Sequence, residues 1–166
     1  MFSPFVKKLM FARQFNMEDG KIEFLGDREL LLPVGLVTEF QAFDVDKTYI
    51  FAKKTCIAEL ARITARLGVK GPELVKNLTE IYEAFGLGRI EIKDFDVKNG
   101  RAIINIMDSP VARDYIRKNK SSKRETCNFI AGMLAGIGES IFGKSMEAKE
   151  VKCIAKGDNV CQFIVK

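Results

Sequence analysis

The strongest local constraint in this sequence is a pair of alternating runs joined by a short turn. RIEIKDFDV (89–97) alternates Ile90 and Ile92 with charged neighbours, and GRAIINIMDS (100–109) follows after Lys98-Asn99. Asn-Gly between two such runs is a strong signal for a β-hairpin, because both residues tolerate positive φ. A chain that contains this hairpin must build at least part of an antiparallel sheet.

Helical periodicity on both sides of this hairpin predicts helices that pack on the sheet. The clearest helix is expected over residues 46–67, ending at Gly68, because apolar residues recur there at spacings of three and four: Tyr49, Ala52, Cys56, Leu60, Ile63 and Leu67. Three more helices are predicted over residues 33–43, 71–85 and 124–143. The last has a stripe of Cys127, Ile130, Leu134, Ile137 and Ile141. Gly132 and Gly136 in it would let another backbone approach closely.

Short extended runs are predicted at both ends of the chain. LMFARQF (9–15) and KIEFLG (21–26) flank the turn NMEDG, and RELLLP (28–33) follows as a third run. SMEAKEVKCIA (145–155) and VCQFIVK (160–166) predict a last hairpin around KGDN. The order of elements predicts an α+β fold, with helices packed on an antiparallel sheet. We expect a single domain over residues 1–166, with N-terminal strands and a short helix in 1–45 and the core in 46–166.

Charge and composition narrow the class of protein. The net charge is +5, but the basic residues are spread out. The densest run, RKNKSSKR (117–124), is interpreted as a solvated connection rather than a nucleic-acid patch, because no aromatic residue is interleaved with it. No secretory signal or membrane-spanning run is recognised, so a cytoplasmic location is expected. In that compartment the four cysteines are core thiols, metal ligands or reactive groups.

The stretch EVKCIAKGDNVC (150–161) concentrates two of those cysteines and a glutamate. If the hairpin is centred on Gly157, Cys153 faces Cys161 across the strands, close enough for both thiolates to bind one zinc ion. In a regular strand Glu150 would point to the other face, so it reaches that ion only if the strand bends or bulges. The spacing is not a common zinc pattern, and on spacing alone two buried thiols are the preferred interpretation.

The motif E-x-K-C-x-A-x-G-D-x-x-C-x-F, from Glu150 to Phe163, resembles the 4-vinyl reductase domain family. That family includes archaeal proteins called hydrocarbon-binding and sensor domains of aromatic-responsive activators. The resemblance implies the α+β ligand-binding fold shared with vesicle-tethering transport-particle subunits, and a homodimer. It also implies a closed structural zinc site whose ligands are Cys127, Glu150, Cys153 and Cys161. Cys56 matches no ligand and is expected to be a core thiol.

The resemblance further places five side chains toward a ligand pocket, namely Leu78, Ile104, Ile106, Ala131 and Ala148. The aromatic sensors use a histidine or tryptophan to hold a phenolic hydroxyl, and this chain has neither residue. All five positions are apolar. We therefore expect an apolar guest such as a hydrocarbon, a lipid or an isoprenoid-like molecule. The same five side chains are equally compatible with a closed, filled core.

These observations favour a small-molecule-binding module with a structural zinc ion. Two alternatives remain open: an accessory or catalytic protein of tetrapyrrole vinyl-group reduction, and a scaffold or tethering subunit. An enzyme is the less expected class. The sequence has no dinucleotide-binding glycine motif and no P-loop, and without histidine it lacks the commonest general base.

Overall fold

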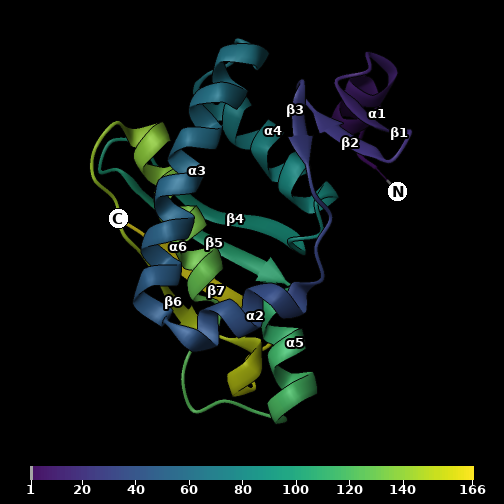
Figure 1. Cartoon of the computed structure of the whole chain (residues 1–166). Coiled ribbons are helices and arrows are strands. Elements are labelled where there is room, and N and C mark those ends of the chain that lie inside the picture. The colour runs from purple at the N-terminus through teal and green to yellow at the C-terminus, as the bar shows by residue number, and fades with distance from the viewer. Residues whose placement is uncertain (1) are drawn as a thin grey trace.

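The structure is a computed structural model that describes residues 2–166 (Figure 1). Its helices are α1 (Pro4–Phe11), α2 (Val34–Phe43), α3 (Val45–Leu67), α4 (Gly71–Ala84), α5 (Pro110–Asn119) and α6 (Asn128–Phe142). Its strands are β1 (Phe15–Glu18), β2 (Lys21–Phe24), β3 (Asp27–Glu29), β4 (Arg89–Asp96), β5 (Arg101–Met107), β6 (Ala148–Lys152) and β7 (Cys161–Val165), and a 3₁₀ turn, η1, spans Ile154–Lys156. Each helix within residues 2–166 is too short or too polar to cross a bilayer.

The strands form two antiparallel sheets. The small one has the order β1-β2-β3, and the central one has the order β4-β5-β7-β6. In the central sheet Ile104 pairs with Ile92 on one side and with Phe163 on the other. The hairpin predicted from Asn99-Gly100 is therefore confirmed, and so is the α+β fold class.

Helix α6 packs on the central sheet, and α3 packs on α6 (Figure 1). Two glycines of α6 make this close approach possible. A Cβ atom on Gly136 would lie 2.6 Å from the carbonyl oxygen of Lys53, and one on Gly132 would overlap that of Tyr49. The prediction that Gly132 and Gly136 admit another backbone is confirmed, and that backbone belongs to α3.

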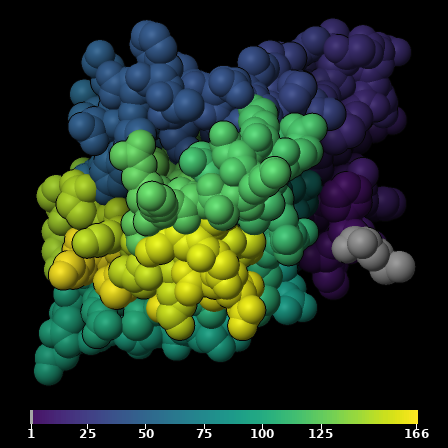
Figure 2. Space-filling view, turned by 90° about the horizontal axis from the view of Figure 1, so that it is seen from below, coloured from purple at the N-terminus to yellow at the C-terminus, as the bar shows by residue number. Residues whose placement is uncertain are grey.

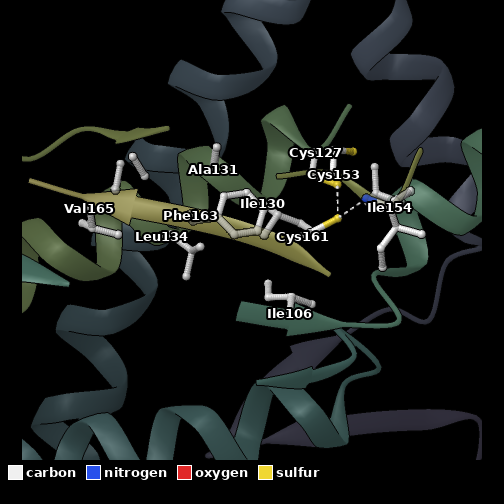
Figure 3. Packing of buried hydrophobic residues seen from close by; sticks show 14 of the residues in the cluster. Ile106, Cys127, Ile130, Ala131, Leu134, Cys153, Ile154, Cys161, Phe163 and Val165 are labelled. Carbon is white, nitrogen blue, oxygen red and sulfur yellow. Dashed lines mark hydrogen bonds between the residues drawn. The ribbon is translucent and has the colours of Figure 1, made fainter. Parts of the chain in front are cut away.

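The apolar interior has two parts. The larger cluster lies between the central sheet, α5 and α6, where Ile106, Ile130 and Phe163 are fully buried (Figure 3). The second lies under α1 and the small sheet, where Phe15 and Phe24 pack with residues of α3 and α4. The same α6 thus covers the sheet that carries the C-terminal hairpin.

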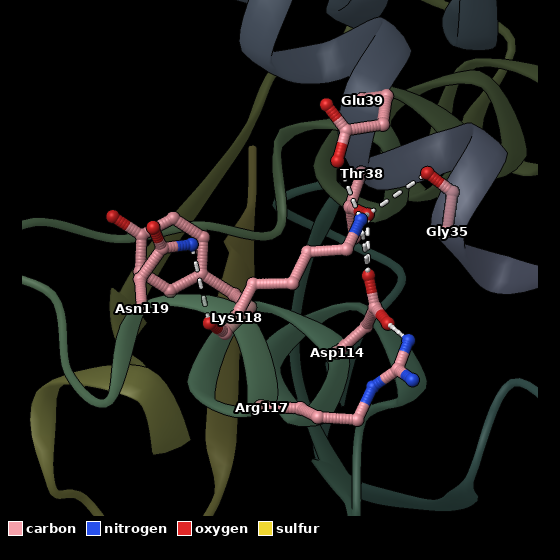
Figure 4. A network of polar contacts seen from close by, with 8 residues as sticks. Gly35, Thr38, Glu39, Asp114, Arg117, Lys118 and Asn119 are labelled. Carbon is pink, nitrogen blue, oxygen red and sulfur yellow. Dashed lines mark hydrogen bonds and ion pairs between the residues drawn. The ribbon is translucent and has the colours of Figure 1, made fainter.

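A buried aspartate joins α5 to α2 (Figure 4). The Asp114 carboxylate accepts hydrogen bonds from the Thr38 hydroxyl and from Arg117, and the Nζ atom of Lys118 lies 3.0 Å from it. The Thr38 hydroxyl bond, the largest influence, and the Arg117 bond hold the pKa of Asp114 well below its usual range. Lys118 also contacts Glu39 at 2.6 Å. This network fixes α2 beside the helix that leads into the C-terminal half.

Several boundaries differ from the sequence predictions. The run LMFARQF was expected to be a strand, but most of it ends α1. The Ser3 side chain accepts a hydrogen bond from the Val6 amide, and Pro4 occupies the first turn, so this helix has a regular N-terminus. Only Arg28 and Glu29 of the run RELLLP belong to a strand.

The segment between β5 and α6 also differs from expectation. Part of the basic run, including Arg117 and Lys118, ends the unpredicted helix α5 instead of forming a connection. Helix α6 begins at Asn128, four residues later than the predicted start at Arg124. Cys127 is therefore the residue before the helix and not a member of its stripe. This position determines the direction in which its thiol points.

Candidate functional site

Four ionisable side chains from separate elements converge at one end of the larger core. They are Cys127, Glu150, Cys153 and Cys161, all buried, and their ligand atoms lie within 4.8 Å of one another. The sulfur atoms of Cys127 and Cys161 are 3.6 Å apart (Figure 3). The structure thus brings together the four residues that the resemblance implied. Cys56 is separate: it lies on α3, with its sulfur 3.5 Å from the Tyr82 hydroxyl.

A bulge in β6 brings Glu150 to the same side as the two hairpin thiols. Glu150 pairs with Phe163, and Lys152 pairs with Gln162, so the register shifts by one residue between them. Cys153 follows Lys152 directly and therefore lies opposite Cys161. This is the irregularity that a shared site requires, because in a regular strand Glu150 and Cys153 would face opposite ways.

The turn after β6 fixes the two hairpin sulfurs. The carboxylate of Asp158 accepts a hydrogen bond from the Cys153 amide at 2.8 Å, and Gly157 adopts a φ of 101°, which favours glycine. The resulting 3₁₀ turn directs the Ile154 amide at the Cys161 sulfur, 3.4 Å away. An amide that donates to a sulfur favours its thiolate form.

The other two side chains meet at the start of α6. The Cys127 amide donates to Oε2 of Glu150 at 2.9 Å, and the Cys127 sulfur lies 3.4 Å from the Ser109 hydroxyl. Thr126 places its hydroxyl 3.4 Å from the Cys153 sulfur. Sequence reasoning did not identify Ser109 or Thr126 as part of the site. Ser109-Pro110 is a recognisable helix start, but nothing local predicts that its hydroxyl reaches Cys127.

The electrostatics of the cluster are those of anionic groups that need a cation. Burial raises the pKa of Glu150 to about 7. Hydrogen bonding to Cys153, followed by that to Cys161, raises the pKa of the Cys127 thiol well above its usual value. The bonds from Cys127 and Cys161 lower the pKa of Cys153. Without a cation, therefore, the protein holds one thiolate stabilised by its neighbours, and a divalent ion would allow all four groups to ionise.

The geometry fits a tetrahedral metal ion. Sulfur atoms bound to one zinc ion at about 2.3 Å are separated by roughly 3.8 Å in a tetrahedron. The separation of 3.6 Å between Cys127 and Cys161 is close to that value. The second carboxylate oxygen of Glu150, Oε1, is buried and has no hydrogen-bond partner. A buried carboxylate oxygen is normally paired, so a metal ion is the partner that this atom lacks.

Apolar cavities lie beside the core, between α4, α6 and the central sheet. Two of them, each of about 40 Å³, share six lining residues: Val75, Ile92, Ile104, Leu134, Ile137 and Ile141. We call this pair the α4–α6 seam. Leu78 and Ile104, two of the predicted pocket residues, line it. Larger depressions of about 540 and 490 Å³ lie elsewhere on the surface and are lined partly by charged residues.

The other three predicted pocket residues lie in the packed core. Ile106 is fully buried and pairs with Cys161, next to the thiol cluster. Ala131 and Ala148 belong to the same closed cluster as Phe163 (Figure 3). Among the cavities formed by residues 2–166, none described here is lined by Ile106, Ala131 or Ala148.

Comparison with known proteins identifies the C-terminal part of the chain. The family model of the 4-vinyl reductase domain matches residues 102–166, which include all four side chains of the cluster. Residues 102–166 belong to the 4-vinyl reductase domain family. The resemblance noted in the sequence is therefore confirmed for this segment. The protein MJ1460 of Methanocaldococcus jannaschii is 28% identical over 121 residues, which cover 73% of this chain and 71% of MJ1460.

Solved structures show that the fold extends beyond the segment that the family model matches. The phenol-responsive sensory domain of the transcription activator PoxR superposes with a TM-score of 0.77 at 19% identity, covering 99% of this chain and 91% of that one. A vinyl-4-reductase family protein from Methanocaldococcus jannaschii gives 0.59 at 24% identity, covering 83% of both chains. A trafficking protein particle complex subunit 3 from Naegleria fowleri, bound covalently to palmitic acid, gives 0.56 at 15% identity over 80% of this chain and 88% of that one.

Proposed function

We propose that this protein binds an apolar small molecule in the α4–α6 seam and that a structural zinc ion braces the adjoining hairpin. The observation that carries the first part is the lining of the seam, which is almost wholly aliphatic and aromatic. Two of the similar folds contain small molecules, phenol in the PoxR domain and palmitic acid in the trafficking subunit. These similarities support the use of this fold for small-molecule binding.

The chemistry of the seam favours a guest without hydrogen-bonding groups. Its polar members are Thr79 and Tyr82. The Thr79 hydroxyl already donates to the carbonyl of Val75 at 3.0 Å, and the Tyr82 hydroxyl lies 3.5 Å from the Cys56 sulfur. A phenol or a carboxylate buried there would lose its hydration without a new partner, which is costly. A hydrocarbon or an isoprenoid-like chain would have no such penalty.

The seam must widen before it can accept such a guest. Its two cavities of about 40 Å³ each are far smaller than the pockets of roughly 300–1,000 Å³ that hold drug-sized ligands. The side of the seam that can yield is α4, since α6 is held between α3 and the sheet. We infer that the structure represents the closed, ligand-free state, and that ligand binding moves α4 away from α6.

The metal assignment rests on the donor set. Three thiolates and one carboxylate suit zinc better than the harder ions calcium or magnesium, which prefer oxygen donors. Four protein ligands leave no coordination position for a reacting water, so a zinc ion here would stabilise the fold and would not activate a nucleophile. In this proposal Cys127, Glu150, Cys153 and Cys161 hold the ion.

Native mass spectrometry of the purified protein tests both parts in one measurement. We expect a mass increase of one zinc ion, confirmed by elemental analysis, and binding of an added long-chain alkane or isoprenoid alcohol. Ile104→Trp should fill the seam and abolish guest binding, while zinc remains bound. Val97→Trp, at an exposed turn position, is the control of equal size and should leave binding unchanged.

The two parts can fail separately. A protein without metal after expression in zinc-supplemented medium contradicts the zinc site. Guest binding that is the same in wild type and Ile104→Trp contradicts the seam as the binding site. The homodimer expected from the resemblance also remains a proposal, and its interface is considered next.

A further inference from the structure

Helix α2 is amphipathic in the inverted sense. Its buried residues are the polar Thr38 and Gln41, whereas Leu36, Phe40 and Phe43 on its other side are exposed. The polar residues serve the interior: Thr38 binds Asp114, and Oε1 of Gln41 accepts from the Phe129 amide at the start of α6. Hydrogen bonding thus fixes α2 with its apolar side outward. Such an arrangement leaves an apolar face without a partner within residues 2–166.

The first turns of α3 extend this face. Ile50 and Phe51 are half exposed, and the rings of Phe40 and Phe51 meet edge to face with centroids 6.0 Å apart. We call the five residues Leu36, Phe40, Phe43, Ile50 and Phe51 the α2–α3 face. In Figure 2 the segment that contains it (blue) forms one edge of the molecule beside α5 (green). The face is continuous across two helices, unlike the scattered apolar residues usual on protein surfaces.

We propose that the α2–α3 face is the interface on which a second copy of this chain docks. This inference does not depend on the small-molecule proposal. The area agrees with it. The three phenylalanines are 50%, 89% and 54% exposed, so at about 200 Å² per ring side chain they present roughly 400 Å². One half of a standard interface covers about 800 Å², of which somewhat more than half is apolar. With Leu36 and Ile50 added, the face supplies that apolar share.

The charges around the face favour a second copy over a membrane surface. Two acidic residues, Glu39 and Asp46, and two basic ones, Lys47 and Lys54, are exposed on the same two helices. Their charges cancel, whereas attachment to anionic lipids needs an excess of Lys and Arg. A balanced rim is compatible with a two-fold interface, in which the same surface must complement itself.

The test is the mass of the wild-type chain in solution, measured by light scattering at about 100 µM and by sedimentation on dilution to about 0.1 µM. We expect a dimer. Phe43→Glu places one carboxylate from each copy in the interface and should weaken dimerisation at least about 100-fold. Phe43 is 89% exposed, so the substitution should leave the monomer folded, which circular dichroism checks. Leu36→Lys, at the other end of α2, should act in the same direction.

Phe11→Glu is the matched control, because Phe11 is 93% exposed but lies at the end of α1, outside the face. It should not change the dimer. A monomeric wild type at the highest concentration overturns the proposal, and so does a dimer that Phe43→Glu leaves intact. Equal dissociation by Phe11→Glu and Phe43→Glu would overturn it as well. Binding of a monomeric wild type to phosphatidylserine vesicles, lost in Phe43→Glu, would assign the face to a membrane instead.

Discussion

Replacing Cys161 by serine is the sharpest test of the metal centre, because the chain contains its own control. Cys161 and Cys56 are both buried, but only Cys161 belongs to the cluster. Serine keeps the shape of either side chain approximately and removes a soft ligand only at position 161. A difference between the two variants therefore reports the metal and not the loss of a buried thiol.

The expected magnitudes differ severalfold. A ligand that binds only the folded state, at a free concentration a thousand times its dissociation constant, stabilises that state by about 4 kcal/mol. For a chain of this size, about 2–4 °C of melting temperature corresponds to each kcal/mol, so Cys161→Ser should lower it by roughly 8–16 °C. At position 56 the Tyr82 hydroxyl, 3.5 Å from the sulfur, can bond the new hydroxyl. The cost there should be about 1 kcal/mol.

The assay is thermal unfolding with and without a chelator, together with metal analysis of each variant. Wild type and Cys56→Ser should contain one equivalent of zinc and should both lose stability when it is removed. Cys161→Ser should contain less than a stoichiometric amount, and the chelator should change its melting temperature little. A full equivalent of zinc in Cys161→Ser, or a wild type that is indifferent to chelation, would refute the reasoning.

Two further predictions concern the packing that supports the site. Gly136→Ala should destabilise the fold by about 1–2 kcal/mol in urea unfolding, because the close contact with the Lys53 carbonyl outweighs the better helix propensity of alanine; Ser140→Ala, at an exposed position of the same helix, should be nearly neutral. Asp114→Asn should cost about 2 kcal/mol at pH 7. Because the folded-state pKa of Asp114 is depressed, its contribution is present above the ordinary value of 3.8 and is lost on acidification, so the gap between wild type and variant in urea unfolding should narrow toward pH 3. A gap that is constant with pH would contradict the second prediction, and a neutral Gly136→Ala the first.

The elements with local signals could be predicted from the sequence. Asn99-Gly100 fixes one hairpin, and Gly68, which has a φ of 67°, ends α3 where the sequence indicated. Helix α1 had such a signal in Ser3-Pro4, but the apparent alternation in LMFARQF obscured it. Helix α5 could not be recognised by an apolar stripe, because one of its buried residues is Asp114, whose partner Thr38 lies 76 positions earlier. A buried ion pair of this kind is a tertiary property, and no window of local sequence contains it.

The pocket was harder to predict than the metal centre for a related reason. Ile104 and Ile106 lie on the same face of β5, two residues apart, and the sequence treats them alike. In the structure Ile104 lines the seam, whereas Ile106 lies beside Cys161, where the packed core leaves no described cavity. The alternation of a strand predicts which face a residue occupies. How far along that face the covering helices leave a space depends on their packing, which the pattern does not encode.

The metal centre shows the same division between local and tertiary information. The centring of the hairpin on Gly157 was enough to place Cys153 opposite Cys161. Spacing alone would have directed Glu150 away from both, and only the one-residue shift between Glu150 and Lys152 reverses that direction. The shift leaves Oε1 of Glu150 buried without a partner, which costs free energy in a metal-free protein. A bulge that creates an unpaired carboxylate oxygen is unfavourable on its own, and an ion bound between Glu150 and the three thiolates would compensate for that cost.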